Sequence, residues 1–129
     1  MSAGNDLTTQ AVRLAMSMSQ VRADFASQNI AQASTPGAQA VRVDFGLSQG
    51  LLEQAISGAG SSDEKSLLTS LSEAALKPAS SEHRDAPGTA INLDEEVADM
   101  SSANLKYSAL TESLNRHFGL MRLAISGRN

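Results

Sequence analysis

The last third of the chain carries a long helical repeat of apolar residues. Between residues 93 and 125, ten positions alternate at spacings of four and three, and eight of them are apolar or aromatic. They are Leu93, Val97, Met100, Asn104, Tyr107, Thr111, Leu114, Phe118, Met121 and Ile125. This spacing is typical of a coiled-coil seam, and at ~1.5 Å per residue it predicts a helix roughly 50 Å long. So long a helix exceeds the core of a compact domain of 129 residues, so we expect it to need a partner of similar length.

The first third of the chain predicts a second long helix with the same type of seam. Its seam positions are Leu7, Ala11, Leu14, Met18, Val21 and Phe25. We expect the helix to begin near Asn5 or Asp6, which are good N-cap residues, and to run to about Ala33. The pairing of the two terminal helices predicts an antiparallel, coiled-coil-like hairpin that neighbouring subunits complete.

A turn and an extended tract follow the first helix. Proline lacks an N–H and restricts the residue before it, so Thr35-Pro36-Gly37 predicts the end of the helix. Proline followed by glycine also suits a type II turn. Residues 38–45 then alternate apolar and polar side chains, which is a strand-like period of two. Because no second strand is evident, we expect this tract to lie on the helices or on another subunit.

The remainder of the middle segment predicts short helices and a loop. Residues 46–56 and 61–76 carry leucines at helical spacings, and the Gly- and Ser-rich stretch 57–62 separates them. Ser61, with a glutamate three residues later, forms a capping box at the start of the second helix. Residues 77–90 hold two prolines, a glycine and a run of polar residues, which predicts a mobile loop.

The predicted fold is an all-α, elongated hairpin of long terminal helices with a small irregular middle that contains the extended tract and the short helices. We divide the chain into an N-terminal helix and turn (1–36), the middle segment (37–92) and the C-terminal helix (93–129). Asn92 is the expected N-cap of the last helix, and Gly127 is its expected end. The two ends together form one structural domain.

No set of residues predicts catalysis or the binding of a cofactor. The three consecutive carboxylates Asp94, Glu95 and Glu96 lie in the first turn of a helix, where they stabilise the helix dipole. His83 and His117 are far apart and lack metal-ligand spacing. Neither a nucleophile elbow nor a phosphate-binding glycine loop occurs. We therefore expect neither an enzyme nor a metal, a cofactor or a small-molecule substrate.

Composition narrows the choice of partner and compartment. The net charge is −4 and the ten Lys and Arg residues are scattered, which argues against nucleic acid as a partner. The absence of cysteine removes disulfides and thiol chemistry. The first ten residues contain no Lys or Arg and no apolar core, so we expect a protein without a cleaved secretion signal, either cytoplasmic or exported by another route.

Two ends of the chain resemble the flagellar rod and hook axial proteins. Residues 29–37, Asn-Ile-Ala-Gln-Ala-Ser-Thr-Pro-Gly, are similar to an N-terminal motif of that family, and Asp44-Phe45 follows where rod members have a similar pair. Residues 91–96 (Ile-Asn-Leu-Asp-Glu-Glu) and 104–110 (Asn-Leu-Lys-Tyr-Ser-Ala-Leu) are similar to its C-terminal pattern, which the tail 115–127 continues. The short length and the tail resemble the proximal rod subunits most. The middle of the chain carries no resemblance.

Two residues depart from the family motif. Gln32 stands where the family has a second asparagine, and Ala38 stands where it has a tyrosine. Gln32 retains an amide that can form hydrogen bonds. Ala38 removes an aromatic contact from the turn, which leaves the packing of that turn without its usual anchor.

The resemblance implies a structural function. Such subunits are exported unfolded through the flagellar type III apparatus and polymerise into the helical tube, the rod, that crosses the periplasm. Their partners are further copies, other rod proteins, and the adapter and export gate at the membrane ring. The residues themselves also fit a different class, a soluble helical adaptor or export chaperone that binds one partner helix in a groove.

The assembly interface is expected along both seams and around the turn. Asn29 is interpreted as a contact between subunits or as a solvated helix amide. Asn104 either sets the register by pairing across an interface or lies at a wet edge, and Tyr107 either packs with its hydroxyl at the rim or joins an interface directly. The expected interface residues are Leu14, Met18, Val21, Phe25, Asn29, Ile30, Thr35, Pro36, Gly37, Val43, Asp44, Phe45, Met100, Asn104, Tyr107, Leu110, Leu114, Phe118, Met121 and Ile125.

Overall fold

The computed structural model describes residues 3–57 and 64–127, and four helices make up most of them. The two long helices are α1 (Ala3–Gln32) and α4 (Leu93–Ser126). The middle of the chain forms β1 (Val41–Asp44), α2 (Gly46–Ser57), α3 (Glu64–Leu76) and β2 (Ser81–Arg84). The prediction of a mainly helical chain with a long helix at each end is confirmed.

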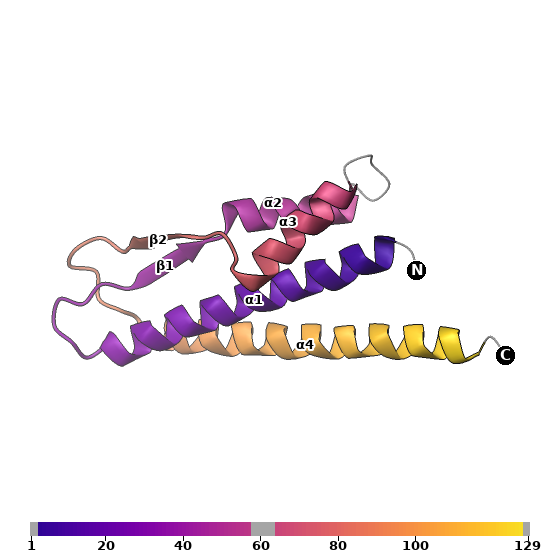
Figure 1. Ribbon diagram of the computed structural model, residues 1–129. Coiled ribbons are helices and arrows are strands. Elements are labelled where there is room, and N and C mark those ends of the chain that lie inside the picture. The colour runs from indigo at the N-terminus through magenta and orange to yellow at the C-terminus, as the bar shows by residue number, and fades with distance from the viewer. Residues whose placement is uncertain (1–2, 58–63, 128–129) are drawn as a thin grey trace.

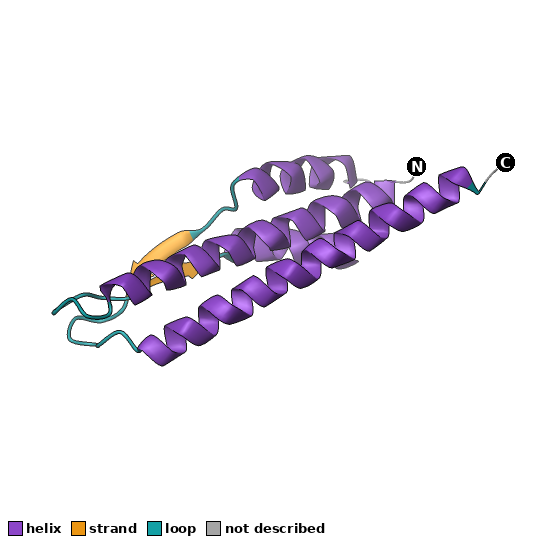
Figure 2. Ribbon diagram, turned by 90° about the horizontal axis from the view of Figure 1, so that it is seen from below, coloured by secondary structure: helices purple, strands orange, loops and turns teal. Residues whose placement is uncertain are grey.

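The two long helices lie against each other and run in opposite directions (Figures 1 and 2). In Figure 1 they overlap where α1 ends and α4 begins, and in Figure 2 they come together toward the termini, so the two helices cross at an angle. Buried small residues, including Ala26 on α1 and Ala103 on α4, allow the close approach. None of the described helices combines the length and the apolar content that a bilayer crossing requires.

The main apolar core lies between α1 and the middle segment rather than between α1 and α4. Its most deeply buried members are Leu14 at 0% exposure, Leu71 at 0% and Phe45 at 1%. The complete buried set is Leu7, Leu14, Met18, Phe45, Leu67, Leu71 and Ala74. Within the described residues, no α4 side chain belongs to this cluster. Leucines of α2 and α3 thus pack on the part of the N-terminal seam that we expected α4 to cover, while α4 contacts α1 along another side of that helix.

The extended tract has a partner strand, which corrects the expectation that it is isolated. β1 pairs with β2 in antiparallel fashion, with Val41 opposite Arg84 and Asp44 opposite Ser81. β2 lies within residues 77–90, the segment for which the sequence predicts a mobile loop. The sequence did not predict β2 because its four residues are all polar and show no alternation with apolar residues. All four are exposed.

Most predicted element boundaries agree with the structure. Thr35 C=O accepts a hydrogen bond from Ala38 N–H at 3.2 Å, and Gly37 has a φ of 78°, as a type II turn requires. Asn92 caps α4 by accepting from the Glu95 N–H at 3.2 Å. α1 begins two residues before Asn5. The expected capping box at Ser61 and most of the predicted break fall outside the described residues.

Candidate functional site

A buried carboxylate lies where α1, β1 and α4 meet. Glu96 belongs to the first turn of α4 and is 1% exposed. Its Oε1 accepts a hydrogen bond from Arg42 Nη1 at 2.7 Å, and its Oε2 accepts one from Asn29 Nδ2 at 3.1 Å. A carboxylate buried to this degree needs charged and hydrogen-bonding partners, and here α1 and β1 supply one each.

Arg42 bridges two carboxylates from different segments. Its Nη2 and Nε donate to the two oxygens of Asp85 at 3.1 and 3.4 Å, while Nη1 bonds to Glu96. The hydrogen bond with Asp85 is the largest cause that raises the pKa of Arg42 above its ordinary value, although burial acts in the opposite direction. Asp99 lies farther away, at 4.0 Å. The guanidinium therefore stays charged and joins β1 to α4 and to the segment after β2.

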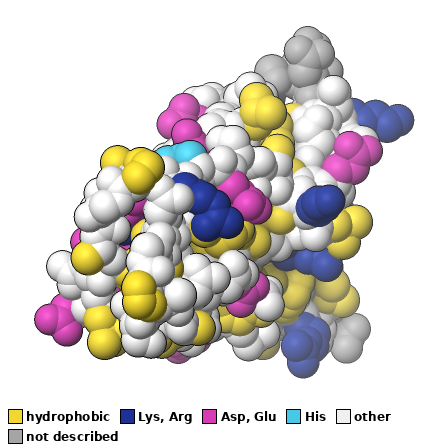
Figure 3. Space-filling view, turned by 90° about the vertical axis from the view of Figure 1, so that its left-hand side faces the viewer, with side chains coloured by type: hydrophobic (Ala, Val, Ile, Leu, Met, Phe, Trp, Pro, Cys, Tyr) yellow, Lys and Arg dark blue, Asp and Glu magenta, His cyan; other side chains and the backbone are white. Residues whose placement is uncertain are grey.

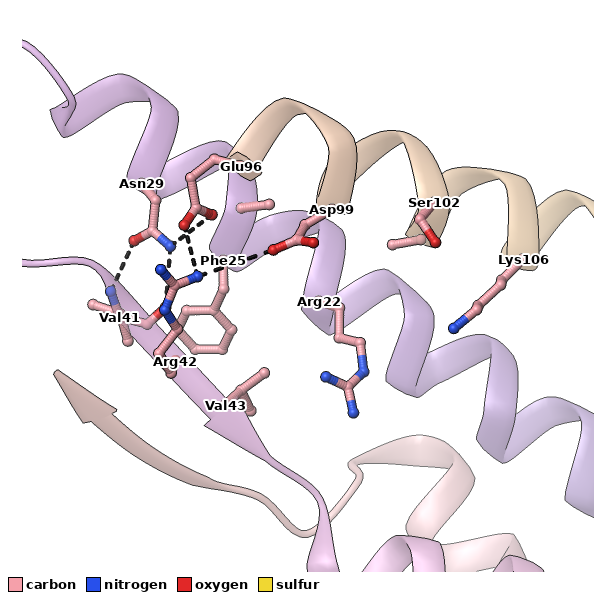
Figure 4. A pocket seen from close by; sticks show the side chains of 12 residues that line it. Arg22, Phe25, Asn29, Val41, Arg42, Val43, Glu96, Asp99, Ser102 and Lys106 are labelled. Atoms are coloured by element: carbon pink, nitrogen blue, oxygen red, sulfur yellow. Dashed lines mark hydrogen bonds and ion pairs between the residues drawn. The ribbon is translucent and has the colours of Figure 1, made fainter. Parts of the chain in front are cut away.

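Asn29 places α1 in the same network (Figure 4). Its Oδ1 accepts from the backbone N–H of Val41 at 2.9 Å, and its Nδ2 donates to the Val41 C=O at 3.1 Å and to Glu96. Asn29 is 1% exposed. The solvated alternative is wrong, and the hydrogen bonds that we expected Asn29 to offer another subunit are formed within the chain.

A hollow of about 300 Å³ opens beside this network, between α1, β1 and α4. Arg22 and Lys106 border it (Figure 4), and Arg22 stacks over the Phe45 ring at 4.9 Å from the ring centre. The carboxylates nearby are already paired with Arg42. Among the described residues, no three His, Cys, Asp or Glu side chains cluster closely enough to hold a metal ion. The arrangement can fix the relative position of three elements.

The second notable surface is the outer side of α4. Leu105 is 72% exposed and Leu123 is 65% exposed. These two leucines are 18 residues apart, about five turns, so they share one face of the helix. Leu105 also lies nine residues after the buried Glu96, about two and a half turns, and so points away from α1. Leu120 and Ile125 add exposed apolar area near the C-terminal end of α4.

The structure divides the expected interface residues among three environments instead of gathering them in one site. Buried within the chain, or packed against its core, are Leu14, Met18, Val21, Asn29, Val43 and Phe45. Partly exposed are Phe25, Ile30, Met100, Leu110, Leu114 and Met121. Exposed are Thr35, Pro36, Gly37, Asp44, Asn104, Tyr107, Phe118 and Ile125. Asn104 thus lies at a wet edge within a single chain, and Tyr107 is 38% exposed.

The sequence analysis missed the network of Arg42, Asp85 and Glu96. Helix-dipole stabilisation accounted for all three acidic residues at the start of α4, so nothing separated Glu96 from its neighbours. One signal was present, because Glu96, Met100 and Ala103 continue the 4-3 spacing on the side of α4 that is least exposed. A charged residue in phase with a buried stripe indicates a buried ion pair.

No family model, curated protein or solved structure matches the chain. The site is therefore interpreted from its own geometry. That geometry combines a polar network, which joins one end of the two long helices, with large apolar side chains on α4 that nothing in the described chain covers.

Proposed function

We propose that the chain is a structural subunit of the bacterial flagellar rod, of the proximal type called flagellar basal-body rod protein B. The observation that carries the proposal is the number of large apolar side chains that α4 leaves exposed along its length, which are Leu93, Val97, Leu105, Tyr107, Phe118, Leu120, Leu123 and Ile125. The similarity of residues 29–37 and 104–110 to axial-protein motifs supports the choice of assembly.

The exposed face of α4 favours a role in assembly. Large apolar side chains that remain in water forgo about 25 cal/mol for each Å² that a partner would cover. Leu105, Leu120 and Leu123 are each at least 65% exposed, and they are distributed along the helix. Contacts of this kind, repeated from one subunit to the next, produce an open helical polymer if the rotation does not close a ring.

The proposed assembly uses the two long helices as a unit. α1 and α4 form a coiled-coil-like hairpin, and the uncovered side of α4 packs against the helices of neighbouring subunits to build the inner layer of the tube. The exposed turn at Thr35–Gly37 and the exposed Asp44 provide lateral contacts. The partners are further copies, other rod proteins, and the adapter and export gate of the membrane ring. The location is the periplasmic rod, which transmits torque.

The same apolar face could instead receive one helix of a soluble partner, as an adaptor or export chaperone does. The two functions differ in stoichiometry and location. An adaptor forms a discrete complex with one partner, whereas a rod subunit becomes part of an insoluble structure outside the cytoplasm.

The test is to follow an epitope-tagged chain in the bacterium that encodes it. We expect the tag to co-purify with basal bodies in export-competent cells and to remain in the cytoplasm when the flagellar export apparatus is deleted. We also expect deletion of the gene to abolish hook and filament while the membrane ring remains. A chain that stays cytoplasmic in both strains, in a complex of fixed small stoichiometry, overturns the rod proposal in favour of the adaptor.

A further inference from the structure

The ribbon formed by β1 and β2 has one edge that is closed by a side chain. Asp85 N–H donates to Ala40 C=O at 3.0 Å, so these residues form a hydrogen-bonded pair of the antiparallel ladder. Because such pairs alternate along a ladder, Val41 turns its backbone N–H and C=O away from β2. The amide of Asn29 binds both groups, at 2.9 and 3.1 Å. A side-chain amide thus occupies the place of the next strand.

The opposite edge of the ribbon is open. The same alternation turns the backbone N–H and C=O groups of Glu82 and Arg84 away from β1. Every residue of β2 is exposed, and within the described part of the chain no hydrogen bond reaches these four groups. An open edge of this kind is a template for pairing with another strand.

The charges along β2 indicate which strand can pair with this open edge. We propose that it binds β2 of a second copy of this chain, antiparallel, about a twofold axis at His83. Glu82 then lies opposite Arg84 of the second copy, and Arg84 lies opposite the second copy's Glu82. All four outward backbone groups of each strand pair in this register, and two cross-strand charge pairs of opposite sign form.

Neighbouring registers are unfavourable. A shift by two residues in one direction places Glu82 opposite Glu82 of the second copy. A shift by two residues in the other direction places Arg84 opposite Arg84 of the second copy. In both registers like charges face each other. A shift by one residue misaligns the outward backbone groups. Charged side chains of both signs also lie side by side on the end of the molecule away from the termini (Figure 3).

This pairing is separate from the proposed polymer. A tube whose subunits all point the same way does not relate neighbours by a twofold axis. The pair therefore belongs to chains that are outside the tube. Its failure in an experiment would leave the rod proposal intact, and failure of the rod proposal would leave the pairing intact.

Cysteine crosslinking of the purified full-length chain tests the pair. The chain contains no cysteine, so H83C carries a single thiol. Residues that face each other in a non-hydrogen-bonded pair have Cα atoms about 4.5 Å apart, which is within disulfide range. The matched control is S81C, on the same face of β2, whose two copies would lie about 13 Å apart in this register. We expect mild oxidation to convert most of H83C to a disulfide dimer and at least tenfold less of S81C.

Charge reversal gives an independent measurement by analytical ultracentrifugation. E82R and R84E each bring like charges together and should reduce the dimer fraction. The double variant E82R/R84E exchanges the partners and should restore it to the parental level. The proposal is overturned if the parent chain is monomeric at millimolar concentration, or if S81C crosslinks as well as H83C does. It is also overturned if the double variant has a dimer fraction reduced by the combined effect of the two single substitutions.

Discussion

Glu96 and Arg42 form an ion pair, with 2.7 Å between Oε1 and Nη1, that joins the first turn of α4 to β1. Glu96→Gln removes the charge while it keeps the shape, and Arg42 then loses the most deeply buried of its carboxylate partners. We expect the free energy of unfolding to fall by about 2 kcal/mol, measured by urea denaturation. Glu95→Gln, at an exposed position one residue earlier, should change it by less than about 0.5 kcal/mol. Equal effects of the two substitutions would show that the buried pair contributes little.

Asn29→Ala should have two separable effects. It leaves the backbone groups of Val41 and one oxygen of Glu96 without their partner, at a cost of about 2 kcal/mol in stability. It should also speed hydrogen exchange at the Val41 amide, measured by NMR, more than at amides in the middle of α1. Gln28→Ala, on the exposed side of the same helix, is the control. An unchanged exchange rate at the Val41 amide would contradict the hydrogen bond from Val41 N–H to Asn29 Oδ1.

Substitutions at Leu14 and Leu105 should distinguish an effect on folding from an effect on assembly. Leu14→Ala creates a cavity in the core and should lower the free energy of unfolding by about 3 kcal/mol. Leu105→Ala affects an exposed side chain and should alter it by less than about 0.5 kcal/mol. In cells, Leu105→Asp should reduce incorporation into basal bodies while thermal melting of the purified chain is unchanged. Normal incorporation of Leu105→Asp would remove this face of α4 from the proposed interface.

The turn after α1 depends on the left-handed conformation of Gly37. Its φ of 78° is costly for a residue with a Cβ, so Gly37→Ala should destabilise the chain by about 1–2 kcal/mol. Gly50→Ala, inside α2 with open space around the position, should instead stabilise it by about 0.5–1 kcal/mol. Thermal melting compares the stabilities of the two variants. Melting temperatures that shift in the same direction would contradict the left-handed conformation of Gly37 in the turn.

Local signals predicted most of the secondary structure. The 4-3 spacing located both long helices, Pro36 and Gly37 located the turn, and Asn92 located the start of α4. Each of these features depends on residues close together in the sequence, where propensity, capping and turn chemistry act directly. The prediction of a mainly helical chain needed nothing more.

Partnerships between distant segments were harder to predict. The seam through Leu14 and Met18 was apolar enough for either α4 or the middle helices, and periodicity alone does not choose between them. β2 has no apolar alternation, since its residues Ser81–Arg84 all face water. The role of Glu96 became evident only once Arg42 was placed beside it, from a position 54 residues away.

A small rotation of α4 about its first turn would displace the far end of the helix. The polar network fixes α4 at its first turn, and the far tip lies roughly 50 Å away along the helix. A rotation of about 5° at the fixed end would move that tip by roughly 4 Å; it would change the contacts between α1 and α4, but not the apolar cluster around Leu14, to which no described α4 side chain belongs. In the proposed rod, identical chains would in this way meet their neighbours at slightly different angles.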